Sequence, residues 1–200
     1  MRTRSFDIYR GSAKIGTQDL TVSRSGSALR VDVDIDISVR ILGVRVYRYT
    51  MSNQETWERG RLRTLKASCN DNGTQEFARA ESATGGVQVE GSAYRGTVKG
   101  NPATTTYWTK AFMQRPTWIN TQNGQPMNVP TQRRGTEVFP FKTGSVQAVR
   151  YDCMGDLDTL DLFYNAQNEW IGNRFVARGE TAFFKTRRLG GALASLWVDG

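Results

Sequence analysis

The sequence predicts a single all-β domain in which about ten to twelve antiparallel strands form a largely meandering sheet, curled into a barrel or half-barrel. Apolar and polar residues alternate with a period of two over most of the chain, and long helical periodicity is nearly absent. Glycine-containing turns interrupt the alternation about every ten residues, which is typical of antiparallel sandwiches and barrels. The 200 residues are enough to bury a core, and no apolar run of about 18 residues indicates a membrane-spanning helix.

The turns divide the chain into its predicted elements. Alternation predicts strands over residues 5–10, 13–23, 29–41, 45–58, 62–69, 74–82, 86–93, 125–133, 136–141, 145–154, 157–164, 168–178 and 180–187. Residues 96–124 break the rhythm and predict a crossing segment with one short helix near 107–114, and residues 189–200 form a weakly apolar tail. Because neither a linker nor a repeat interrupts this pattern, we expect one domain over residues 1–200.

The strands at 29–41 and 45–58 form the clearest hairpin. A three-residue loop at 42–44 would place all apolar and aromatic partners on one face and all polar partners on the other, whereas a two-residue loop would mix the faces. The apolar pairs expected from the three-residue loop are Val39 with Tyr47, Ile37 with Tyr49, and Ile35 with Met51. Strands of this length are longer than usual and suit a strongly curled sheet.

The same face continues beyond Met51 through Asn53, Glu55 and Trp57. A carboxylate that points inward beside a tryptophan has its pKa raised by desolvation unless it is paired. Four interpretations of Glu55 remain open: a general acid or base, a group that orients a ligand, half of a buried ion pair with an arginine, and an exposed residue at a frayed strand end. Under the first of these, Tyr47 and Tyr49 would stabilise developing negative charge.

Aromatic residues also flank the irregular segment. Tyr107, Trp108 and Trp118 are candidates for a lid over a cavity, with Asn120 just beyond them, and Met51, Asn53 and Trp57 complete the predicted ligand-binding set. The alternative is a loop that is packed by its own aromatic side chains.

Composition excludes several kinds of chemistry. The chain contains no histidine, so histidine-based triads and metal sites are excluded, and we predict neither a metal nor a cofactor. Cys69 and Cys153 either form a disulfide, as an exported protein would allow, or remain independent thiols. The net charge of +8 comes from scattered cations, which indicates a solvated sheet face, and we expect no nucleic-acid partner.

Several short motifs resemble those of a known family. They comprise Phe6-Asp-Ile-Tyr-Arg-Gly, Val31-Asp-Val-Asp-Ile-Asp-Ile, Glu55-Thr-Trp57, Asp71-Asn-Gly73, Tyr107-Trp108 and Gly155-Asp-Leu. Over about residues 5–187 the chain resembles a bacterial family of exported all-β domains of unknown function, which is similar to half-barrel, lipocalin-like and lipoprotein-carrier-like domains. The resemblance implies export and a curled sheet, and it implies no activity or catalytic residue.

These observations favour a binding or carrier protein for a lipophilic or aromatic small molecule in the bacterial cell envelope. One alternative is a cofactor-independent lyase, isomerase or hydrolase that acts on such a molecule with a carboxylate as acid or base. The other is an envelope interaction protein whose basic surface contacts anionic lipid or glycan. No apolar segment precedes the first strand, so the expected periplasmic location requires a leader that has been removed, and a cytoplasmic location is the alternative.

Overall fold

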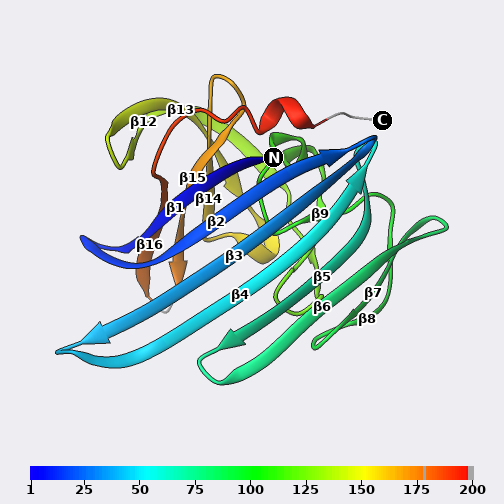
Figure 1. Cartoon of the computed structure of the whole chain (residues 1–200), viewed down its shortest axis with the longest axis horizontal. Helices are drawn as coiled ribbons and strands as arrows, with labels where there is room; N and C mark the ends of the chain where they lie inside the picture. Colours follow the sequence, from blue (N-terminus) through cyan, green and yellow to red (C-terminus); the bar gives the residue numbers. More distant parts are fainter. Residues whose placement is uncertain (178, 198–200) are drawn as a thin grey trace.

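Thirteen strands form one open antiparallel sheet in the computed structural model, which describes residues 1–177 and 179–197. The strands hydrogen-bond in the order β12-β13-β14-β15-β16-β1-β2-β3-β4-β5-β6-β7-β8, so β12 and β8 are the edges and the sheet curls without closing. Their bounds are β1 Arg2–Arg10, β2 Ala13–Ser25, β3 Ala28–Ile41, β4 Val44–Glu58, β5 Arg61–Asp71, β6 Thr74–Ala83, β7 Gly86–Gly91, β8 Arg95–Lys99, β12 Thr131–Phe141, β13 Gly144–Cys153, β14 Leu160–Asn165, β15 Trp170–Ala177 and β16 Glu180–Thr186. Figure 1 shows β1–β8 as a broad curved layer, with β14–β16 turning away behind it.

The segment between β8 and β12 packs against the inner face of this sheet. It contains a second, three-stranded sheet and a short 3-10 helix: β9 Ala103–Thr104, η1 Lys110–Gln114, β10 Thr117–Ile119 and β11 Pro126–Asn128. Two further 3-10 helices are η2 Gly155–Leu157 and η3 Ala194–Leu196. Within the described residues, no helix is long and apolar enough to cross a membrane.

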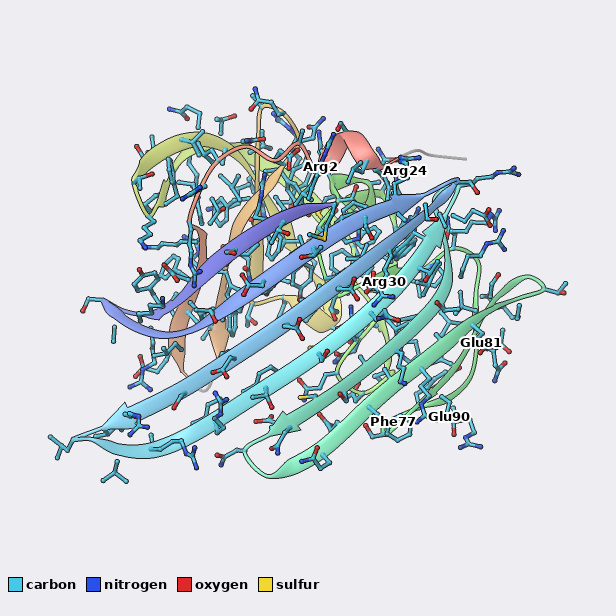
Figure 2. The ribbon with its side chains drawn as sticks, in the orientation of Figure 1. Arg2, Arg24, Arg30, Phe77, Glu81 and Glu90 are labelled. Atoms are coloured by element: carbon cyan, nitrogen blue, oxygen red, sulfur yellow. The ribbon has the colours of Figure 1, made fainter. Side chains whose placement is uncertain are left out.

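The core lies between the curled sheet and this inserted segment. Its largest side chains come from both, and include Phe6, Trp57 and Trp170 from the sheet and Trp108 and Trp118 from the segment. The outer face of β3–β7 is polar, as Figure 2 shows for the labelled Arg30, Glu81 and Glu90. Alternation along β3, β4 and β5 therefore separates an apolar inner face from a solvated outer face, as the sequence predicts.

The C-terminal segment is tied across one end of the sheet. Arg2 donates a hydrogen bond to the carbonyl oxygen of Ala192, and Arg24 donates one to that of Leu196. Figure 2 shows both arginines beside this segment. The predicted tail at 189–200 is therefore docked as far as residue 197, whereas residues 198–200 lie outside the described residues, as does residue 178 at the end of a predicted strand.

The register of the β3–β4 hairpin confirms the expected face pairing. Val39 pairs with Tyr47, and the predicted partners further along the strands are also found. The loop differs from the prediction: it is a two-residue turn of Leu42 and Gly43, both with positive φ, and a bulge at Val46 supplies the extra residue. The bulge shifts the register by one residue and restores the apolar face that a plain two-residue turn would break.

Three other expectations need correction. The sheet has more strands than expected, partly because Arg95–Lys99 pairs with β7 instead of crossing the barrel. The helix expected near 107–114 is a 3-10 helix that begins at Lys110, because Tyr107 has φ 55 and Thr109 is extended. Cys69 and Cys153 are free and buried on strands far apart in the sheet order, so the disulfide alternative is wrong in this structure.

Candidate functional site

The inner face of the sheet holds a cavity of about 350 Å³. One wall comes from β2, β3, β4, β5, β15 and β16, and the other comes from residues 105–107, 120–122, 157, 159 and 160. Of the predicted site residues, the cavity brings together Tyr47, Tyr49, Met51, Tyr107 and Asn120. Its volume lies in the range of small-molecule pockets.

Three aliphatic residues of β3 give the cavity much of its apolar wall. Val33, Ile35 and Ile37 point inward at alternate positions, and Phe175 and Phe184 face them from β15 and β16. Ile35 and Ile37 are half-buried although they lie on the inner face, which shows that the cavity opens to solvent at this end of the sheet. Apolar surface that is partly exposed in the free protein favours burial by an apolar ligand.

Two tyrosine hydroxyls stand at the rim. The Tyr47 hydroxyl donates to Asp71 Oδ1 at 2.7 Å, and the Tyr49 hydroxyl donates to Gln122 Oε1 at 3.3 Å. Burial raises the pKa of Tyr49, with smaller contributions from Cys69 and its tyrosine neighbours, so the hydroxyl stays protonated at neutral pH. Tyr49 therefore offers a neutral hydroxyl group at the rim.

An amide in the cavity wall has an unused hydrogen-bond acceptor. Asn173 lines the cavity and is 3% exposed, and its Oδ1 has no hydrogen-bond partner among the described residues. A buried polar atom without a partner costs about 1–3 kcal/mol, so such atoms are rare. The amide is therefore an acceptor beside the cavity that the described residues leave unused. Asn173 is absent from the residues that the sequence predicts for the site, and the signal for it in the sequence is its alternation with Phe175 in the strand predicted at 168–178.

Glu55 points inward, as predicted, but lies one layer behind the cavity. Trp57 Nε1 donates to Glu55 Oε2 at 2.7 Å and Asn53 Nδ2 donates to Oε1 at 3.2 Å, and no arginine pairs with it among the described residues. Complete burial raises the pKa of Glu55 to about 7, although these hydrogen bonds partly oppose the shift. Thr106 lies between Glu55 and the cavity. Its hydroxyl is 3.4 Å from Glu55 Oε2, and the residue also belongs to the cavity lining.

The predicted tryptophans belong to the core. Trp57, Trp108 and Trp118 are buried and are absent from the described cavity lining. Trp57 of β4 packs on Phe112 of η1 with ring centroids 5.0 Å apart, and Trp108 packs on Phe112 at 6.3 Å, so aromatic contacts hold this part of the segment both to the sheet and to itself. Of the lid expected from the sequence, Tyr107 alone lines the cavity, and Asn120, expected just beyond the lid, lines it as well.

The two thiols are not placed for nucleophilic chemistry. Burial raises the pKa of Cys69, and it raises the pKa of Cys153 to about 12. Because the thiolate is the reactive form, both cysteines are inert at neutral pH while the protein is folded.

Two other hollows have similar volumes and a different character. One, of about 390 Å³, has a lining with many polar and acidic side chains of β2–β5, and the other, of about 430 Å³, lies between β1 and residues 187–191. The inner cavity differs from them because aliphatic and aromatic side chains form so much of its lining. It is the best candidate for a ligand site.

Fold and site together define a β-barrel-like protein whose open, curled sheet surrounds an interior cavity. The family model described as a domain of unknown function, DUF6134, matches residues 6–187, and the chain belongs to this family. The expected membership of an uncharacterised all-β family is thereby confirmed.

A solved structure supports the fold independently. The beta-barrel-like protein of the domain of unknown function DUF1849 from Brucella abortus is similar with a TM-score of 0.57 and 10% sequence identity, over 92% of this chain and 94% of that chain. At this identity the similarity shows a shared fold. No curated protein matches the chain.

Proposed function

We propose that the protein binds and carries a small lipophilic or aromatic molecule. The observation that supports this proposal is the inner cavity of about 350 Å³, in which partly exposed aliphatic and aromatic side chains surround a buried amide with an unused acceptor. At about 30 Å³ for each water molecule, the cavity has room for roughly a dozen non-hydrogen atoms.

The polar groups of the cavity indicate what such a molecule would carry. Asn173 contributes an unused acceptor to the wall, while Tyr47 and Tyr49 place hydroxyl groups at the rim. A largely apolar molecule with one hydrogen-bond donor, such as a phenol or a protonated short-chain acid, fits this pattern. The proposed location is the bacterial cell envelope, and it rests on the resemblance to exported domains.

A dye titration with two matched variants tests the carrier proposal. We expect the apolar dye 1-naphthol, a fluorescent phenol small enough for this cavity, to bind the protein at one site and to be displaced by 4-propylphenol. Ile35→Trp fills the cavity from β3, whereas Asp34→Trp places the same new side chain on the outer face of the same strand. The proposal predicts at least a tenfold loss of dye affinity in Ile35→Trp and unchanged affinity in Asp34→Trp. Equal affinities in both variants would refute it.

A second candidate function is favoured by the contact between Glu55 and Thr106. A carboxyl group with a pKa of about 7 is suited to proton transfer at neutral pH, and the Thr106 hydroxyl connects it to the cavity. The protein would then be a cofactor-independent enzyme. The test is a screen of small aromatic esters and enolisable ketones with the wild type and Glu55→Gln. Turnover that Glu55→Gln retains in full would eliminate this candidate.

A further inference from the structure

The β3–β4 hairpin projects beyond the rest of the sheet. β2 pairs with β3 as far as Ile37, and β5 pairs with β4 as far as Tyr49, whereas β3 and β4 stay paired with each other up to Ile41 and Val44. Figure 1 shows this hairpin extending past its neighbours at the lower left. Residues 40–46, called the hairpin tip below, therefore form a two-stranded ribbon outside the main ladder.

The hairpin tip is apolar and exposed. Leu42 is 100% exposed and Val44 is 66% exposed, and Ile41 and Val46 are each about half exposed. Ile41 and Val44 are cross-strand partners, so their side chains share one face of the ribbon. Isolated exposed apolar residues are common, but a cluster at the end of a projecting hairpin is typical of an interaction site.

The fold itself does not favour leucine at position 42. Leu42 has φ 49, in the left-handed region that asparagine and glycine adopt far more readily. In two-residue turns of this kind asparagine is the preferred residue. A leucine that is strained and gains no burial from folding is best explained by a contact outside the chain.

The tip is also cationic. Arg40 and Arg45 are direct cross-strand partners, an arrangement of like charges that is unfavourable within the hairpin itself. Residues 37–49 contain no acidic residue, and neither arginine forms an ion pair within the described residues. Arg48, nearer the sheet, pairs with Asp36. Within the described residues, two arginines without an acidic partner thus flank the exposed apolar side chains of the hairpin tip.

We propose that the hairpin tip docks the protein on an anionic lipid bilayer. Leu42, Ile41 and Val44 would enter the interfacial region, while Arg40 and Arg45 would contact lipid phosphates. Apolar side chains combined with basic charge form the surface that such a membrane binds, and an acidic protein partner would leave the apolar side chains without a matching surface. The ribbon leads into the cavity wall at Ile37 and Tyr47, so docking would bring the open end of the cavity to the bilayer.

Vesicle flotation with the full-length chain tests the proposal without any cavity ligand. We expect binding to vesicles of phosphatidylcholine and phosphatidylglycerol at 7:3, and weak binding to vesicles of phosphatidylcholine alone. Leu42→Asn should lower the partition coefficient about tenfold, because one buried leucine side chain is lost from the interface. Replacing Arg40 and Arg45 by glutamine should lower it about fivefold for each charge, and added salt should weaken the wild type more than this double variant.

Measuring Tm together with vesicle binding separates an effect of each substitution on folding from its effect on membrane binding. Leu42→Asn suits the left-handed backbone, so its Tm should equal or exceed that of the wild type. Val138→Asn is the matched control, because Val138 is an exposed apolar residue on β12, away from the tip, and we expect it to bind as the wild type does. Equal binding by Leu42→Asn and the wild type would overturn the proposal. So would a change of oligomeric state in Leu42→Asn without a change in vesicle binding, which would assign the tip to a second copy of the chain. Dye binding is measured separately, so either proposal can fail while the other stands.

Discussion

Replacing Glu55 by glutamine is predicted to make the protein more stable at neutral and mildly alkaline pH. The side chain is completely buried without a cationic partner, and desolvation raises its pKa to about 7. Asn53 Oδ1, beside it, has no hydrogen-bond partner within the described residues. With the Asn53 side-chain amide turned by 180°, a protonated Glu55 would donate a hydrogen bond to Asn53 Oδ1. Glutamine at position 55 would donate the same hydrogen bond through its neutral amide group.

The sign and size of the effect follow from the two pKa values of Glu55. The folded value of about 7 exceeds the ordinary value of 4.5, so between these pH values the folded protein keeps a proton that the unfolded chain has lost. The free energy of unfolding therefore falls as pH rises through this window, and the full loss is reached above pH 7. The difference between the pKa values corresponds to about 3 kcal/mol, or a Tm shift of about 6–12 °C for a domain of this size.

Thermal unfolding followed by circular dichroism between pH 5 and pH 8 measures this effect. The Tm of the wild type should fall across the range relative to that of Glu55→Gln. Glu81→Gln, which removes an exposed carboxylate from β6, should give a curve parallel to the wild type. Parallel curves for the wild type and Glu55→Gln would refute the reasoning, because they would show that Glu55 does not change protonation between the folded and unfolded chains in this range.

Three further predictions concern buried residues of the main sheet. Arg4→Ala should destabilise the protein by about 3–5 kcal/mol in urea unfolding, because it leaves the buried Glu169 carboxylate without its ion-pair partner at 2.9 Å; a loss below about 1 kcal/mol would show that the pair is dispensable. Gly172→Ala should lower Tm strongly, since an added Cβ would overlap the backbone oxygen of Phe184 on β16 and the ring of Phe139 on β12, and an unchanged Tm would contradict that packing. Cys69 and Cys153 should resist iodoacetamide at pH 8 in the folded protein and react after unfolding in guanidinium, whereas rapid alkylation of the folded protein would show that the thiols are accessible.

The sequence predicts local features of the sheet well. Strict alternation in β3 and β4 is enough to predict which residues face inward, because a slip of one residue would move every side chain to the other face. It does not distinguish a three-residue loop from a two-residue turn with a bulge at Val46, because both give the same pairing beyond Val39. The face of Glu55 was therefore predictable, although the geometry of the turn was not.

The composition of the site depends on contacts between distant parts of the chain. The inserted segment places Thr106 between Glu55 and the cavity and buries Trp118 in the core, and no periodicity within the segment indicates either position. Asn173 escapes prediction for a related reason, since Trp170, Ile171 and Gly172, which precede it, are all buried and the strand lacks a polar outer face there. The buried pair of Arg4 and Glu169 joins positions that are far apart in the sequence.

Native mass spectrometry of the protein, purified with minimal washing from cells with intact envelopes, tests the carrier proposal most directly. The proposal predicts one small apolar molecule bound to each wild-type chain, retained by Asp34→Trp and lost from Ile35→Trp, in which the cavity of about 350 Å³ is filled. Wild-type protein that has no adduct and also fails to bind the apolar dye would contradict it.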